Sequence, residues 1–278
     1  MFAMYKLKRH LSNGSRTVGI MLTLFFIVFP IFWLVLTSFK NLRDAFSTKL
    51  FFEPSLDNYS RLFAHPWNFE PMVLNSIIIS TTTVLIAVPL ATMAAFAFSR
   101  YRFRGQDLLL VSVLASQFLP GVVIILPYFI QFRNLGLLDT RTGLIIVNLS
   151  FAIPFATWLL KGFIDTVPIQ IEESALVDGC SEWQVLRHVT VPLLKPGLIT
   201  AAVFTFITSW NEFLFAFILT KDRAAPMIVG LRGLVETRGV PWELLSAAGV
   251  LIMLPIFLMS LSIRRHFVQG LTMGAVKE

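Results

Sequence analysis

The chain is poor in charged residues and in cysteine. Of its 278 residues 14% are charged, against about 25% in a typical soluble domain. The single cysteine, Cys180, excludes an internal disulfide and so a disulfide-rich secreted module. The four histidines lack metal-ligand spacing, so no metal site is expected. With 56% hydrophobic residues, the composition also excludes a disordered or fibrous protein and argues against a soluble enzyme.

Six stretches with little or no charge run along the chain. A helix of about 20 residues crosses the roughly 30 Å hydrocarbon core of a bilayer, and each stretch is about that long or longer. Soluble helices keep a polar face, which these stretches lack. We therefore expect an all-α, polytopic membrane protein with six transmembrane helices in a single domain of residues 1–278. The expected spans are residues 17–39, 73–99, 108–132, 142–160, 196–220 and 244–263.

The basic residues predict an orientation. The segment before the first span is basic, and three arginines lie within residues 100–104, beside the end of the second span. By the positive-inside rule these short segments face the cytoplasm. The first span is then an uncleaved anchor, both termini are cytoplasmic, and residues 161–195 form a cytoplasmic loop.

The loop of residues 161–195 has the pattern of two short helices. Pro168 suits the first turn of a helix, and Gly179 can adopt the positive φ that ends one. Ser181 begins a capping box, and Pro192 is expected to stop the second helix. The pattern predicts a sharp helical hairpin at the inner membrane face, which could serve as a docking element.

Part of this hairpin resembles the EAA motif of ABC importer permeases. The usual motif is Glu-Ala-Ala, three residues, Gly, nine residues and Ile-x-Leu-Pro. This chain has Glu173-Ser-Ala, then Gly179, then Val189-x-Val-Pro192, and its departures are small or apolar exchanges. Three further segments, residues 100–105, 209–213 and 269–277, resemble the carbohydrate-uptake branch and its MalG-like subunits.

The resemblance implies a type I ABC importer in a bacterial or archaeal cytoplasmic membrane. The chain would pair with a second, related permease, two copies of a separate ATPase would bind beneath them, and a binding protein would deliver sugar from outside. ATP and Mg would bind the ATPase, because this chain has no Walker A pattern. The chain itself would be no enzyme and would hold no cofactor. It would move a di- or oligosaccharide inward by alternating access.

The resemblance also assigns the hairpin to ATPase coupling. Glu173 would be the acidic contact to the ATPase, and Gly179 the turn between the helices. Without the motif, Glu173 would be read as a carboxylate at a helix N-terminus on a solvated surface. The coupling candidates are Glu172, Glu173, Ser174, Ala175, Asp178, Gly179 and Pro192.

Glu212 is the one ionisable residue inside an expected span. Such residues are costly in a membrane and are by default functional, so Glu212 is a candidate for the substrate pathway together with Trp210 and Asn211. The alternative is a structural role with backbone groups or a partner subunit. Other polar residues in the spans are expected to join helices rather than contact sugar: Asn75, Gln117, Gln131 and Asn148.

The outer loop of residues 221–243 contains an apolar run with a glycine. By analogy with the maltose system, this run is a hypothesis for contact with the binding protein. An ordinary connection near the membrane surface is the alternative. The residues are Met227, Ile228, Val229, Gly230 and Leu231.

Two further questions stay open at the level of sequence. A permease-like scaffold or sensor that docks an ATPase without transporting would carry the same motifs. An anionic sugar should need a compensating cation in the pathway, and no lysine or arginine lies inside an expected span. This favours a neutral sugar, unless the partner permease carries the whole site or helix N-termini bind the anion.

Overall fold

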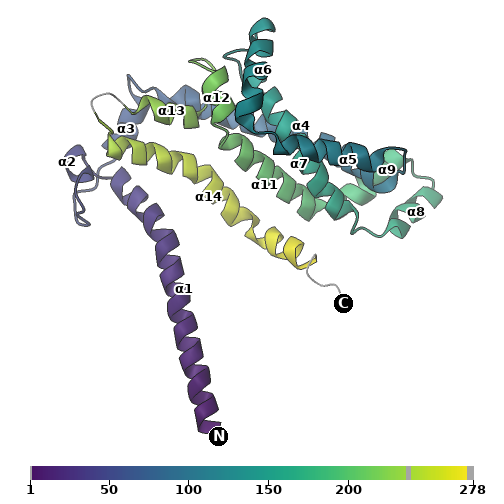
Figure 1. Cartoon of the computed structure of the whole chain (residues 1–278), viewed down its shortest axis with the longest axis horizontal. Coiled ribbons are helices and arrows are strands. Elements are labelled where there is room, and N and C mark those ends of the chain that lie inside the picture. The colour runs from purple at the N-terminus through teal and green to yellow at the C-terminus, as the bar shows by residue number, and fades with distance from the viewer. Residues whose placement is uncertain (1, 236–238, 274–278) are drawn as a thin grey trace. The chain divides into compact units, whose positions relative to one another are not determined.

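The computed structural model describes residues 2–235 and 239–273, and within them every regular element is helical (Figure 1). This confirms the all-α prediction. Four segments are long and apolar enough to cross a bilayer, as expected from their uncharged windows. They are Arg16–Ser38 of α1 (Phe2–Ser38), α4 (Phe69–Arg100), α7 (Arg141–Ile164) and Trp242–Leu261 of α14 (Trp242–Met273).

The third expected span is broken rather than straight. Helix α5 (Gln106–Ala115) continues through a 3₁₀ turn to Phe118, and α6 (Gly121–Asn134) then leaves at 95°. Pro120 lies between them with ψ of 127°, outside the helical region. Because proline disfavours a helical conformation in the residue before it, the span expected over residues 108–132 is divided into two helices at this point.

The fifth expected span is also interrupted. It consists of α11 (Lys195–Trp210) and the short α12 (Leu214–Leu219). The carboxylate of Glu212 accepts the backbone N–H groups of Phe215 and Ala216 at 2.8 and 2.9 Å. Since the first N–H groups of a helix have no partner within it, Glu212 favours a new helix start here over continuation of α11.

By contact the chain divides into two compact units, Met1–Trp67 with Gly233–Met253 and Asn68–Arg232 with Leu254–Glu278. In the first unit, the Asn58 amide donates to the carbonyls of Ser38 and Lys40 and so ties the following loop to the end of α1. The short helices of this unit are α2 (Leu42–Ala45) and α3 (Asp57–Phe63).

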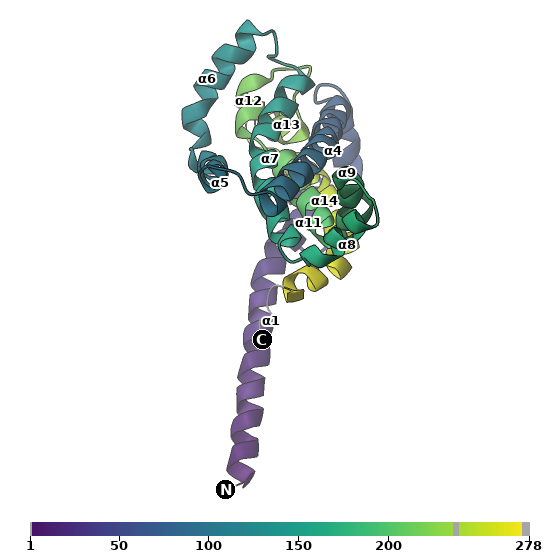
Figure 2. The same ribbon diagram turned by 90° about the vertical axis from the view of Figure 1, so that its right-hand side faces the viewer.

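The core of the second unit is made by α4, α7 and α11, which pack along one another (Figures 1 and 2). Small residues on all three helices are fully buried where they meet, which lets the backbones approach closely. At one end this core is closed by larger side chains, including Leu160 and Ile164. The buried small residues are Ala91, Ala95, Ala156 and Ala201.

Candidate functional site

A helical hairpin follows α7, as the sequence predicts. Helix α8 (Ile169–Val177) ends in Gly179, whose φ is +90°. The N–H of Cys180 donates to the carbonyl of Ala175, which is the six-to-one bond of a Schellman turn. A residue with a Cβ is strained at this φ, so Gly179 allows the tight reversal between the two arms.

The second arm begins with the expected capping box and runs further than expected. Ser181 and Gln184 exchange the two hydrogen bonds of the box at the start of α9 (Glu182–Val185). A π-helical turn (Leu186–Thr190) and α10 (Val191–Leu193) follow. Pro192 therefore does not stop this arm. It lies in the first turn of α10, where its missing N–H is tolerated, and the chain bends by 81° before α11.

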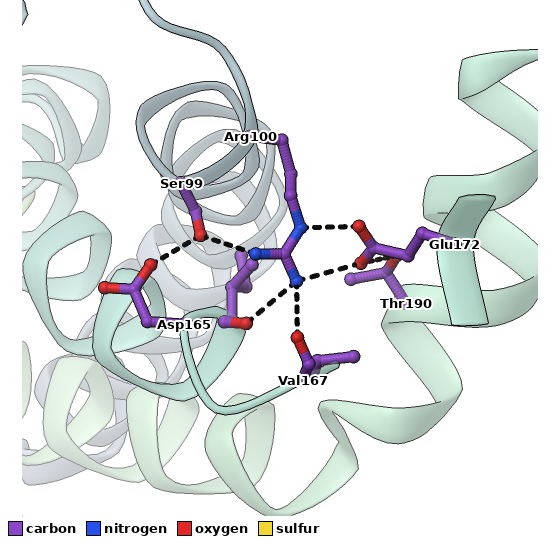
Figure 3. Close-up of polar contacts among 7 residues, drawn as sticks. Ser99, Arg100, Asp165, Val167, Glu172 and Thr190 are labelled. Carbon is purple, nitrogen blue, oxygen red and sulfur yellow. Dashed lines mark hydrogen bonds and ion pairs between the residues drawn. The ribbon is translucent and has the colours of Figure 1, made fainter. Parts of the chain in front are cut away.

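Arg100, the last residue of α4, binds the first turn of α8 (Figure 3). Its Nε donates to Oε2 of Glu172 at 2.5 Å and its Nη2 to Oε1 at 3.2 Å. The side chains are 12% and 5% exposed, respectively. Paired N–H donors on one carboxylate make a strong, directional contact, and little water reaches it.

The same guanidinium also fixes the end of α7. Its Nη2 donates to the carbonyls of Ile164 and Val167, both at 3.0 Å. These carbonyls lie at and beyond the helix C-terminus, where a cation is favourable. Its Nη1 donates to Ser99, whose hydroxyl donates to Asp165 (Figure 3).

Thr190 completes this network from the π-helical turn. Its hydroxyl donates to Oε1 of Glu172 at 2.8 Å (Figure 3). One buried carboxylate thus joins both arms of the hairpin to α4. We call this network the Arg100 cluster; it consists of Ser99, Arg100, Asp165, Glu172 and Thr190.

A second contact lies beside the Arg100 cluster. The hydroxyl of Tyr101 donates to the carboxylate of Glu182 in α9. This hydrogen bond, with burial and the negative charge, raises the pKa of Tyr101. Tyr101, the C-cap of α4, therefore holds the start of the second arm in addition to the Arg100 cluster.

The structure separates the predicted coupling residues into two groups. Glu172 is buried in the Arg100 cluster, and Ala175 is half-buried. The rest are exposed: Glu173, Ser174, Asp178, Gly179 and Pro192. The hairpin tip adds apolar residues that the motif does not include, among them Val177, which is 87% exposed, and Trp183. The predicted tail at residues 269–277 is helical to Met273, and residues 274–277 lie outside the described part of the chain.

Arg100, Thr190 and Tyr101 were not among the predicted site residues. The signal for Arg100 was present in the sequence, as the first of three arginines beside a span. It was explained by membrane topology, which accounts for basic residues there equally well.

The structure places the three candidate pathway residues in different surroundings. Glu212 caps α12 and lines a cavity of 330 Å³. Trp210 is buried and stacks on Phe206, whereas Asn211 is exposed and ends α11. Each carboxylate oxygen of Glu212 thus accepts one backbone N–H group, as the structural role for this residue predicts. Gln117 and Asn148, expected to join helices, also line this cavity.

The predicted binding-protein run is a helix, α13 (Met227–Gly233), rather than a projecting loop. The N–H of Met227 donates to Ser76 of α4. Gly230 is buried, and a Cβ there would lie 2.5 Å from Sδ of Met72. Burial of its apolar residues explains why this run packs onto α4; Ile228, Val229 and Leu231 remain half-buried.

A polar clamp holds the segment before α13. The carboxylate of Asp139 accepts backbone N–H groups from four consecutive residues, 221–224. Burial raises the pKa of Asp139, but these four bonds outweigh it and leave the pKa below its ordinary value. Asn75 donates to the carbonyls of Arg223 and Ala225 and accepts from Arg141, so its expected joining role is confirmed.

Comparison with known proteins shows the family. The chain belongs to the binding-protein-dependent transport system inner membrane components, whose family pattern matches residues 87–273, including the hairpin. It is 38% identical over 275 residues to the probable ABC transporter permease protein y4oR of Sinorhizobium fredii, covering 96% of this chain and 99% of that protein. It is 36% identical over 258 residues to the trehalose transport system permease protein SugB of Mycobacterium tuberculosis, covering 91% and 93%.

A solved structure shares the fold. A bacterial ABC transporter involved in the import of the acidic polysaccharide alginate matches with a TM-score of 0.76 and 24% identity, over 93% of this chain and 97% of that chain. The chain is therefore a multi-pass membrane permease component of a binding-protein-dependent ABC importer. It is not an enzyme; a separate ATPase subunit hydrolyses ATP.

Proposed function

We propose that this chain is one half of a heterodimeric permease that moves a sugar into the cytoplasm by alternating access. The hairpin of α8 and α9 would receive the motion of a separate ATPase. ATP and Mg²⁺ would bind that ATPase, and this chain would bind no cofactor. The observation that carries the proposal is the Arg100 cluster, because it joins the hairpin to the helices that would have to move.

Coupling requires a hairpin that is held rigidly. A hairpin that hung on flexible connections would absorb a displacement instead of passing it on. The nearly buried guanidinium of Arg100 binds the carboxylate of α8 and two carbonyls at the end of α7. Displacement of the hairpin should therefore move α4 and α7 as one body.

The exposed tip of the hairpin supports a protein partner. Val177 and Trp183 are large exposed apolar side chains, and Glu173 and Asp178 add negative charge beside them. Exposed apolar surface rimmed by charged residues is typical of an interaction site. The ATPase can shift the permease between states only if it binds this tip differently in each.

The coupling role fixes an orientation. If the hairpin faces the ATPase, the C-terminal ends of α4 and α7 are cytoplasmic, and so are both chain termini. The opposite end of the second unit, with α13 and the Asp139 clamp, then faces the binding protein. The exposed residues there include Lys221, Arg223 and Arg232.

The test uses the complete transporter in lipid vesicles, with its partner permease, ATPase and binding protein. Glu173→Lys reverses an exposed charge at the tip without touching the Arg100 cluster. Glu53→Lys, at an exposed site in the other unit, is the matched control. We expect Glu173→Lys to abolish stimulation of ATP hydrolysis by the binding protein, and Glu53→Lys to keep it.

Two results would contradict this proposal. One is a Glu173→Lys transporter that the binding protein stimulates as it does the wild type. The other is a wild-type complex whose ATPase responds to the binding protein while no sugar accumulates in the vesicles, which would indicate a sensor.

A further inference from the structure

The 330 Å³ cavity of the second unit lies among α7, the end of α11 and the break between α5 and α6. Its volume is at the lower end of the range for small-molecule sites. The residues that line it come from three of the expected spans, so it is built by the fold rather than by one loop.

Three residues that line this cavity carry buried polar atoms without partners among the described residues. Thr205 and Ser209, one helical turn apart on α11, are 1% and 8% exposed. Their hydroxyl oxygens, and Nε2 of Gln117, have no hydrogen-bond partner among the described residues. Buried polar groups in proteins are as a rule hydrogen-bonded, so these three atoms indicate a polar ligand.

Other threonines of α11 show that a hydroxyl on this helix can find a hydrogen-bond partner. The hydroxyl of Thr200 donates to the carbonyl of Pro196, four residues back, at 2.9 Å. Thr208 does the same with Phe204. Thr205 could be satisfied in this way but is not.

The rest of the lining favours an uncharged ligand with apolar faces. Phe151 and Phe155, one turn apart on α7, contribute aromatic rings. Glu212 is the one charged residue among the described residues that line the cavity, and both its oxygens already accept backbone N–H groups. A solute with its own carboxylate would find no cation here and would meet a negative charge.

We propose that this chain, and not only its partner permease, holds a subsite for an uncharged mono- or disaccharide in this cavity. Thr205, Ser209 and Gln117 hydrogen-bond the sugar hydroxyls, and Phe151 and Phe155 pack against its carbon-bound faces. The inference rests on the proposed function, because the sugar reaches the cavity during transport.

The experiment removes the hydroxyls with little change of shape. Thr205→Val and Ser209→Ala are made singly and together in the complete transporter, in vesicles with saturating binding protein. Thr200→Val, on the same helix but outside the cavity, is the matched control. The probes are radiolabelled trehalose, maltose and diacetylchitobiose, with digalacturonate as the anionic comparison. ATP hydrolysis is measured in parallel.

We expect the double variant to take up the transported uncharged sugar at least tenfold more slowly than the wild type. Its ATPase should still respond to the binding protein, and Thr200→Val should behave as the wild type. Wild-type uptake by the double variant would overturn the subsite, as would an equal loss in Thr200→Val. Uptake of digalacturonate alone would overturn the assignment to an uncharged sugar.

Failure of the proposed function would look different. In that case the wild type itself would fail: its ATPase would not respond to the binding protein, or it would respond while none of the four sugars entered the vesicles. Uptake and ATP hydrolysis by the wild type therefore separate a wrong function from a wrong subsite.

Discussion

Replacing Arg100 by methionine would leave the carboxylate of Glu172 buried, with Thr190 as its one remaining hydrogen-bond donor in the Arg100 cluster. Removing one partner of a buried ion pair costs about 3–5 kcal/mol. The Arg100 side chain is 12% exposed, so water can reach part of the site, and we expect about 3 kcal/mol, the lower end of that range. The carbonyls of Ile164 and Val167 lose a donor as well.

This cost should appear as local opening of the hairpin. A loss of about 3 kcal/mol corresponds to roughly 100-fold in an opening equilibrium. Hydrogen exchange measured by mass spectrometry on the transporter in lipid should therefore show about 100-fold faster exchange in peptides from residues 169–191. The exposed Arg104→Met, four residues away, is the matched control and should leave exchange unchanged.

The double variant Arg100→Met/Glu172→Met tests the reasoning more sharply. Replacing both members of a buried ion pair by apolar residues is often neutral, so the double variant should regain most of the lost protection. Coupling in the single variant should weaken, with less stimulation of ATP hydrolysis by the binding protein. Wild-type exchange in Arg100→Met, or a double variant as open as the single one, would refute a role for this pair in fixing the hairpin.

Two further predictions concern the turn and the clamp. Gly179→Ala should speed hydrogen exchange in the hairpin, because an alanine at φ of +90° is strained by about 1–2 kcal/mol. The control is Gly162→Ala, in a helix with open space around the added Cβ, which should leave exchange unchanged. Equal effects of the two substitutions would refute the role of strain at Gly179. The pKa of Asp139 is lowered in the fold, so its stabilisation is present above the unfolded-state pKa of about 4 and is lost as pH falls toward the folded-state pKa. The midpoint temperature of thermal unfolding should then fall more on acidification in the wild type than in Asp139→Asn. Parallel pH profiles of the two proteins would contradict a stabilising role for the Asp139 carboxylate.

The membrane-spanning helices could be predicted from the sequence, because a long stretch of residues without charge is enough to indicate a span. Which of their prolines breaks a helix could not be predicted. Seven prolines lie in the expected spans. Of these, Pro196 lies in the first turn of α11, and Pro120 is the one that stands between two helices. Whether a proline bends or breaks a helix depends on which tertiary partners replace the lost hydrogen bond, and the local sequence does not contain that information. The five prolines inside helices are Pro30, Pro89, Pro127, Pro154 and Pro255.

The features of the hairpin site also differ in whether they could be predicted from local sequence. The turn at Gly179 and the capping box at Ser181 were predictable because both depend on neighbouring residues. The pair of Arg100 and Glu172 joins residues 72 positions apart. Each had a sufficient local explanation, the arginine in membrane topology and the glutamate in the helix dipole, so nothing in the sequence required them to meet.

The two attachments of the hairpin have a mechanical consequence. Arg100 binds α8 through Glu172, and the adjacent Tyr101 binds α9 through Glu182. A body held at one point can swivel about it, whereas a body held at two separate points transmits torque as well as translation. A tilt imposed on the hairpin would therefore reach the end of α4 as a torque as well as a displacement.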